Sequence, residues 1–228
     1  MSNTFTGFTP DTIDFLWHLA LNNNRTWFEE NKNTYRHTLQ DPLKALVEEV
    51  HTQVSTAFPK HGFIKKVTRI HRDARRVKDG QPYKTSLWMS IEHPVEEWTS
   101  TPVFWFEIGR ESYSYGLGYY AAKALTMQKF RARLDRNPAQ FEKLIGFLDK
   151  QTEFTLSGDE YKRAKTPPTE TLAAWYNRKS FSIIHTQPND AGLYSPDLAT
   201  RLADGYKSLM PLYDYFITLD HDPDPREV

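Results

Sequence analysis

The N-terminal part of the chain carries apolar side chains at helical spacing. Ile13, Leu16 and Ala20 recur every three or four residues, which predicts a helix that begins after an N-cap at Thr9 and ends at the asparagines of residues 22–24. A capping box at residues 26–29 predicts a second helix. A third is predicted from residue 41, with its apolar stripe running to a break at Pro59.

From about residue 63 to residue 118 the apolar period changes to two. Leu87, Met89 and Ile91 alternate with other side chains, residues 103–108 form a continuous apolar run, and residues 113–117 alternate again. Gly and Pro separate these segments at residues 79–80, 93–94 and 109–110. The pattern predicts an antiparallel β meander in the middle of the chain.

Helical spacing returns in the C-terminal half. Helices are predicted for residues 121–134, from Asn137 onward and from Ser195 onward, where Pro211 is expected to break the last of them. Residues 181–185 predict a further strand. Helices and strands are segregated along the chain, which predicts an α+β fold with the meander packed by N-terminal and C-terminal helices. Residues 1–220 are expected to form a single domain, and residues 221–228 a disordered, charged tail.

Charge is concentrated in one segment. Residues 65–84 hold eight Lys/Arg and two Asp, a local charge of +6, whereas the formal net charge of the whole chain is zero. So much like charge calls for an anionic counterpart, either from the protein's own carboxylates or from a ligand.

An extended conformation would place Arg69, His71, Asp73 and Arg75 on one face of this segment, because side chains alternate along a strand. Guanidinium groups match phosphate or carboxylate oxygens with two hydrogen bonds, and a turn would bring further cations around the same anion. The residues expected to bind the ligand are Arg69, Arg72, Arg75, Lys78, Tyr83, Lys84, Trp27 and Asn31. A solvated hairpin, or one neutralised by the protein's own Glu residues, is the competing interpretation.

Trp27 and Asn31 enter this set because they fall on one stripe of the second predicted helix, together with Tyr35. An aromatic ring beside an amide could flank a ligand, although packing of that helix face against the sheet is the more common arrangement. The candidates for acid–base catalysis are Asp73, His71 and Glu107, the last of which sits near the end of a predicted strand.

Several classes of site are excluded or disfavoured by composition. The chain has no cysteine, so disulfides, thiolate metal sites and Cys nucleophiles are excluded, and no metal site is expected. It shows neither a signal peptide nor a long apolar segment, so we expect a cytoplasmic protein without a membrane span. The zero net charge makes nucleic acid a less favoured partner than a small anion or a phosphate group. No motif identifies a cofactor.

Four motifs occur along the chain in the order Trp27-Phe28 with Asn31-Lys32 and Tyr35, Arg69-Ile70-x-Arg72-Asp73-x-Arg75, Pro82-Tyr83-Lys84-Thr85 and Gly116-x-Gly118-Tyr119. In these motifs the chain resembles the domain of unknown function 2461 family, whose members are mostly bacterial. The resemblance runs over nearly the whole chain and implies a shared fold, but it brings no established activity with it. Arg76 departs from the family pattern, in which an aromatic residue, commonly Phe, is expected.

Three functions remain open at this point. The first is a protein that binds a phosphate-bearing or other anionic ligand through the basic hairpin. The second is an enzyme that acts on a small anionic substrate, with the arginines as electrostatic stabilisers. The third is a structural or partner-binding protein whose hairpin is neutralised internally.

Overall fold

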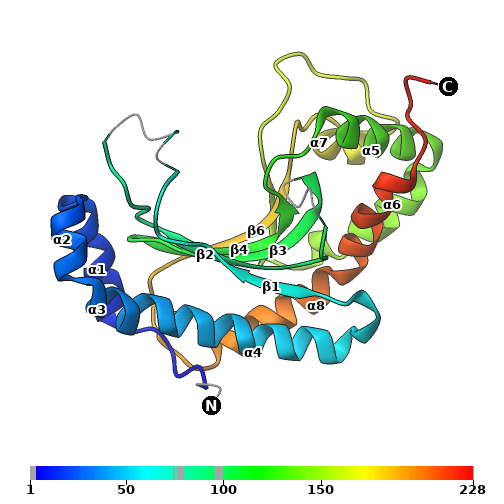
Figure 1. The fold of residues 1–228 in the computed structure, drawn as a ribbon. Coiled ribbons are helices and arrows are strands. Elements are labelled where there is room, and N and C mark those ends of the chain that lie inside the picture. The colour runs from blue at the N-terminus through cyan, green and yellow to red at the C-terminus, as the bar shows by residue number, and fades with distance from the viewer. Residues whose placement is uncertain (1–3, 74, 76–79, 96–99, 228) are drawn as a thin grey trace. The chain divides into compact units, whose positions relative to one another are not determined.

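The computed structural model describes residues 4–73, 75, 80–95 and 100–227 (Figure 1). The chain forms two compact units, and both are discontinuous in sequence. Unit 1 comprises Met1–Ile91, Trp105–Tyr115 and Thr186–Lys207, and unit 2 comprises Glu92–Phe104, Gly116–His185 and Ser208–Val228. Lys78, one of the predicted ligand-binding residues, lies outside the described residues.

The predicted α+β class is confirmed. A six-stranded antiparallel sheet has the strand order β1-β2-β3-β4-β6-β5. Its strands are β1 (Ile64–Val67), β2 (Leu87–Glu92), β3 (Pro102–Ile108), β4 (Ser112–Tyr119), β5 (Thr155–Ser157) and β6 (Ser182–Pro188). The first four strands form the predicted meander. β5 falls in a polar stretch whose periodicity predicts no strand, and it pairs with β6 so that Thr155 lies opposite Ile184.

Helices flank the meander in the sequence, as predicted. Those before it are α1 (Pro10–Leu21), α2 (Arg25–Glu30), α3 (Lys32–Thr34), the π-helix η1 (Tyr35–Gln40), α4 (Asp41–Ala57) and η2 (Pro59–His61). Those after it are α5 (Ala124–Arg136), α6 (Pro138–Ile145), η5 (Leu148–Lys150), η6 (Glu170–Leu172), α7 (Ala173–Tyr176), α8 (Leu198–Ile217) and η7 (Thr218–His221). The predicted capping box at residues 26–29 is wrong: α2 begins earlier, because Asn24 is its N-cap and accepts the Trp27 N–H at 3.0 Å.

Alternation along β3 gives its two faces different environments. Phe104, Phe106 and Ile108 are fully buried, whereas Trp105 and Glu107, on the opposite face, are half-buried. In unit 1 the Phe106 ring stacks on Phe8, with the ring centroids 6.1 Å apart. One face of this strand therefore belongs to the core, and the other presents polar and aromatic side chains to solvent.

The predictions at the C-terminal end need two corrections. α8 continues through Pro211 instead of breaking there; Pro211 is exposed, so its ring lies on the solvent side of the helix. The start of the predicted disordered tail is held in place, since Arg133 Nε donates to Asp222 Oδ2 at 2.7 Å and both side chains are largely buried. This hydrogen bond is the main reason why the pKa of Asp222 is lowered.

A single hydroxyl group joins α1 to the long helical segment α3–η1–α4. Pro42 has no N–H, so the Thr38 carbonyl loses the donor that would normally lie four residues ahead of it. Thr12, which is fully buried on α1, donates its hydroxyl to that carbonyl at 2.6 Å. The π-helical turn occurs in the same place, where the regular hydrogen-bond ladder is interrupted.

Thr12→Val keeps the shape of the side chain but removes this donor. We expect it to lower the free energy of unfolding by about 1–3 kcal/mol, because a buried carbonyl loses a partner. Urea denaturation followed by circular dichroism measures the loss. The control is Thr52→Val, which removes an exposed hydroxyl that donates to the Glu48 carbonyl, and its effect should stay within about 0.5 kcal/mol. Equal effects of the two variants would contradict the role assigned to Thr12.

Candidate functional site

The basic segment forms a hairpin, but only a short part of it is extended. His71 and Tyr83 form an antiparallel bridge, Arg72 N–H donates to the Pro82 carbonyl, and Lys84 N–H donates to the Ile70 carbonyl, each at 2.8 Å. The regular strand β1 ends before this ladder begins. The extended face predicted to run from Arg69 to Arg75 is therefore supported by strand pairing only around His71.

The hairpin is fixed to α2 by aromatic and amide contacts. The Tyr83 ring stacks on Phe28, with the centroids 4.1 Å apart and the planes inclined by 22°. Asn23 exchanges two hydrogen bonds of 3.0 Å with the Tyr83 backbone, one accepted and one donated. His71 completes the cluster, 5.7 Å from Phe28 and 5.2 Å from Tyr83. We call Asn23, Phe28, His71 and Tyr83 the hairpin anchor.

The hairpin anchor changes the roles expected for two site residues. Tyr83 is 3% exposed, so its ring supports the hairpin and does not close over an anion. His71 contacts Phe28 and Tyr83 in the same cluster, while its side chain stays exposed. Both residues help to hold the hairpin in place.

Arg75 is already neutralised. Its Nε and Nη2 donate to the two carboxylate oxygens of Asp73 at 3.0 and 2.8 Å, and its backbone N–H adds a third bond to the same carboxylate. This bidentate pair is the main reason why the pKa of Arg75 is raised. For Arg75 this contact is the kind of pair that the internal-neutralisation interpretation expects. Asp73 is occupied by the same contact and is a poor candidate for a catalytic acid or base.

Arg72 remains with the hairpin backbone. Its Nη1 donates to the Gln81 carbonyl at 3.1 Å, across the turn from the Arg72–Pro82 backbone bond. This contact closes the tip of the described part of the hairpin. Arg72 therefore has a structural task whether or not a ligand is bound.

Two cations at the base of the hairpin differ from the others. Among the described residues, Arg69 and Lys84 form no salt bridge with a carboxylate. They are near each other along the hairpin, because the Lys84 N–H donates to the carbonyl of Ile70, the neighbour of Arg69. Ser86 follows two residues after Lys84 and donates its hydroxyl to Glu107 Oε1 of β3 at 2.6 Å. We call Arg69, Lys84, Ser86 and Glu107 the Lys84 site; all four belong to unit 1.

The electrostatics of the Lys84 site follow from this arrangement. The pKa of Lys84 is lowered, first by partial burial and then by the positive charge of Arg69, while Glu107 opposes the shift. Repulsion between the two cations therefore outweighs what the one nearby carboxylate provides. A site with surplus positive charge, a half-buried Lys84 and an exposed Arg69 is suited to an anion.

Sequence reasoning missed two members of this neighbourhood. Ser86 carries no motif of its own, but its spacing from Lys84 would place both on one side of an extended segment. Trp105 precedes Glu107 by two residues on β3, so it lies on the same half-buried face of the strand. The Trp105 ring makes no aromatic or cation–π contact with any other described residue.

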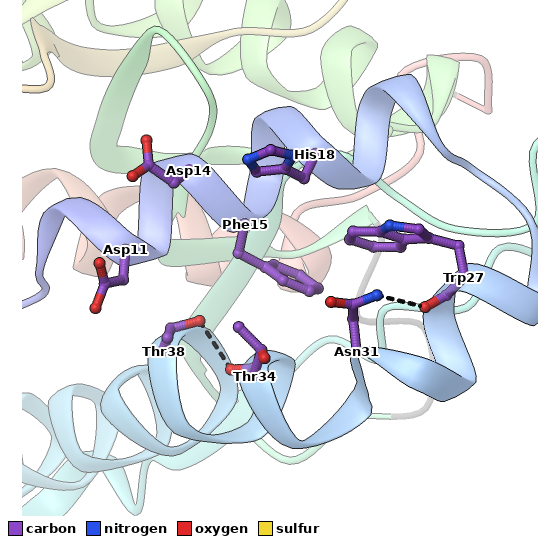
Figure 2. Close-up of a pocket in the computed structure, with 8 residues that line it drawn as sticks. All are labelled: Asp11, Asp14, Phe15, His18, Trp27, Asn31, Thr34 and Thr38. Carbon is purple, nitrogen blue, oxygen red and sulfur yellow. Dashed lines mark hydrogen bonds between the residues drawn. The ribbon is translucent and has the colours of Figure 1, made fainter.

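Trp27 and Asn31 lie elsewhere in unit 1. They line an open pocket of about 350 Å³ between α1 and the α2–η1 segment (Figure 2). The Trp27 ring faces Phe15 of α1 at 5.8 Å, whereas its neighbour Phe28 faces the hairpin. The charged groups of this pocket include Asp11 and Asp14, which would repel an anion. The structure thus separates Trp27 and Asn31 from the basic residues with which they were grouped.

Unit 2 contains another cation that forms no salt bridge with a described carboxylate. Arg131 of α5 is 8% exposed, and its Nη1 has no hydrogen-bond partner among the described residues. Its guanidinium carbon lies 5.3 Å from the centroid of the Tyr161 ring, which also has Lys165 Nζ at 5.5 Å. The electron-rich face of the Tyr161 ring attracts the guanidinium cation electrostatically. Arg131 is therefore explained as a packing cation of unit 2.

Within the described residues, no group of three or more His, Asp or Glu side chains is placed to hold a metal ion. No helix in the same part of the chain combines the length and the apolar character that crossing a membrane requires.

The fold and the Lys84 site define an α+β protein with a basic hairpin anchored on its N-terminal helices. The chain belongs to the family described as "Conserved hypothetical protein (DUF2461)", whose sequence model matches residues 11–215. The match confirms the resemblance found in the motifs and extends across both units. None of the curated proteins searched matches the chain.

Lys84→Met removes one of the two repelling charges and keeps the aliphatic stem. We expect the melting temperature at pH 7 to rise by about 1–2 °C, a small shift because the site is partly solvated. The control is Lys65→Met, which breaks a 3.2 Å ion pair with Glu48 and should give no rise. Differential scanning calorimetry measures both.

The pH dependence provides a second check on Lys84. Because its pKa is lower in the folded protein, the unfolded chain binds the proton more tightly. The loss of folding stability is fully present below the lowered pKa and disappears as pH rises toward 10.5, the ordinary pKa of a lysine side chain. The stability difference between Lys84→Met and the wild type should therefore shrink over this window. A difference that grows with pH would contradict the assignment.

Proposed function

We propose that this protein binds a phosphate-bearing or other anionic ligand through Arg69 and Lys84. The observation that carries the proposal is that Lys84, whose backbone pairs with the neighbour of Arg69, and Arg69 itself form no salt bridge with a described carboxylate. An anion bound near both cations would offset their repulsion and raise the pKa of Lys84 toward its ordinary value. The binding energy would come from relief of an existing electrostatic cost as well as from new contacts.

The two side chains would divide the work of recognition. The Arg69 guanidinium is planar and offers paired N–H donors, which match two oxygens of a phosphate or carboxylate. The Lys84 ammonium is a compact charge with three donors, and its half-buried position strengthens its interaction with an anion. Exposure of Arg69 leaves it accessible to a ligand from solvent.

The proposal narrows the set predicted from sequence. Arg75 is left out because Asp73 neutralises it, and Tyr83 is left out because its ring is buried in the hairpin anchor. A small anion fits a site with two cations better than a nucleic acid does, since a nucleic acid requires an extended series of phosphate contacts. We keep the cytoplasmic location as part of the proposal, because the chain lacks cysteine.

An enzyme acting on an anionic substrate is the second candidate. The observation that favours it is the 2.6 Å hydrogen bond from Ser86 to Glu107, which places an oriented carboxylate beside the two cations. Glu107 would then serve as the acid or base, with Arg69 and Lys84 stabilising charge in the transition state. Phosphorus NMR of the protein incubated with a phosphate ester distinguishes turnover from binding, and Glu107→Gln should abolish any turnover.

Anion binding predicts selective thermal stabilisation by inorganic phosphate. With phosphate at about ten times its dissociation constant, the wild type should gain about 1.4 kcal/mol, or roughly 3–6 °C in melting temperature. Arg69→Ala and Lys84→Ala should lose most of this gain, because each removes a contact to the anion. Arg75→Ala should keep it, because the Asp73 pair is separate from the site.

Arg75→Ala is the matched control, since it removes the same positive charge from the same hairpin. Phosphate also stabilises proteins by exclusion from their surface, and this general effect should be equal in all variants. Only the difference between the variants therefore reports on the site. If Arg69→Ala and Lys84→Ala respond to phosphate as the wild type does, the proposed function is wrong.

A further inference from the structure

Glu107 is the member of the Lys84 site that a simple anion site does not need. It lies close enough to Lys84 to influence its pKa, and its side chain is half-buried on β3. A carboxylate in this position repels an incoming anion, so it lowers the affinity for bare phosphate. Its presence therefore points to a ligand that offers Glu107 something other than negative charge.

The hydrogen bonds of Glu107 indicate that the ligand offers a hydrogen-bond donor. Within the described part of the chain, its side chain has one partner, the Ser86 hydroxyl on Oε1. An ionised carboxylate can accept several hydrogen bonds, so Oε2 retains its capacity. A ligand hydroxyl would donate to Oε2, and a hydrogen bond to a charged group is among the stronger ones.

We propose that the ligand of the Lys84 site is a hydroxyl-bearing phosphate ester of the sugar phosphate type, whose phosphate binds Arg69 and Lys84 and whose hydroxyl donates to Glu107. This inference rests on the proposed function. It adds that Glu107 selects the organic part of the ligand, by repelling anions that lack a donor and accepting a bond from those that have one.

Trp105 supplies a surface for the carbon skeleton of such a ligand. It lies two residues before Glu107 on the same face of β3, so the two side chains are roughly 7 Å apart along the strand. Its ring is half-buried and makes no ring contact with another described residue. A sugar ring that donates a hydrogen bond to Glu107 would pack against the flat apolar face of Trp105. The methyl group of methyl phosphate would cover only a small part of that face.

Ser86 is a positioning residue in this scheme. Its donated hydrogen bond fixes Glu107 Oε1, and this leaves the other oxygen directed to the ligand. Removing the hydroxyl would free the carboxylate to rotate toward Lys84. Ser86→Ala should therefore weaken the selection for hydroxyl-bearing ligands while phosphate itself remains bound.

The experiment compares methyl phosphate with ribose 5-phosphate by isothermal titration calorimetry on the full chain. The wild type should bind ribose 5-phosphate about tenfold to a hundredfold more tightly, the range expected for a hydrogen bond to a charged acceptor. Glu107→Gln should bind methyl phosphate several-fold more tightly, because the repelling charge is gone, and its preference for the sugar should fall about tenfold.

Trp105→Ala is the second variant and separates the aromatic contact from the charge. It should weaken ribose 5-phosphate and leave methyl phosphate unchanged. Equal affinities of the wild type for the two ligands would overturn this inference and leave the proposed anion binding standing. An unchanged preference of Glu107→Gln for ribose 5-phosphate over methyl phosphate would also overturn this inference. If the wild type binds neither ligand, both the inference and the proposed function fail.

Discussion

The stacking of Tyr83 on Phe28, reinforced by the two hydrogen bonds from Asn23, determines where the basic hairpin lies. Lys84 is the next residue in the chain, so the anchored backbone fixes its starting point and pairs it with Ile70. The cations at the base of the hairpin are therefore positioned by buried aromatic contacts and not by attraction to carboxylates. This is why like charges can be held together: the cost of their repulsion is offset by packing on the other side of the strand.

The cations of the hairpin differ in whether they form a salt bridge, according to their distance from the hairpin anchor. Arg75 lies toward the tip, where a neighbour two residues away neutralises it in a local pair. Arg69 and Lys84 lie at the base, next to β2 and β3, where the sheet restricts the backbone and the nearest carboxylate is already bonded to Ser86. Local pairs form readily in loops because the side chains can adapt, but the sheet fixes side-chain directions.

The sequence was sufficient for the elements whose pattern is local and regular. The N-cap at Thr9, the meander strands and the helix opened by Asn137 follow from caps and periodicity. The predicted helix break at Pro211 was wrong, because burial of the residues around it maintains α8 despite the missing N–H. The segment that holds the candidate site was predicted from its charge, but the partner that each charged side chain finds was not. Partner choice is tertiary: nothing in the spacing of Trp27 shows that its ring faces Phe15 and an acidic pocket.

A buried or half-buried charge without a carboxylate partner is costly, and Arg131 and Lys84 are two such cations among the described residues. Arg131 lies against the face of Tyr161, which lowers the cost within the protein itself. Lys84 is repelled by Arg69, and the nearby Glu107 carboxylate accepts a hydrogen bond from Ser86. The described residues therefore do not offset the cost of burying the Lys84 charge. Retaining an unfavourable arrangement is a mark of sites that act on something outside the chain, because stability alone would favour its loss. For this reason the Lys84 site, and not the more deeply buried Arg131, is the place to look for a ligand.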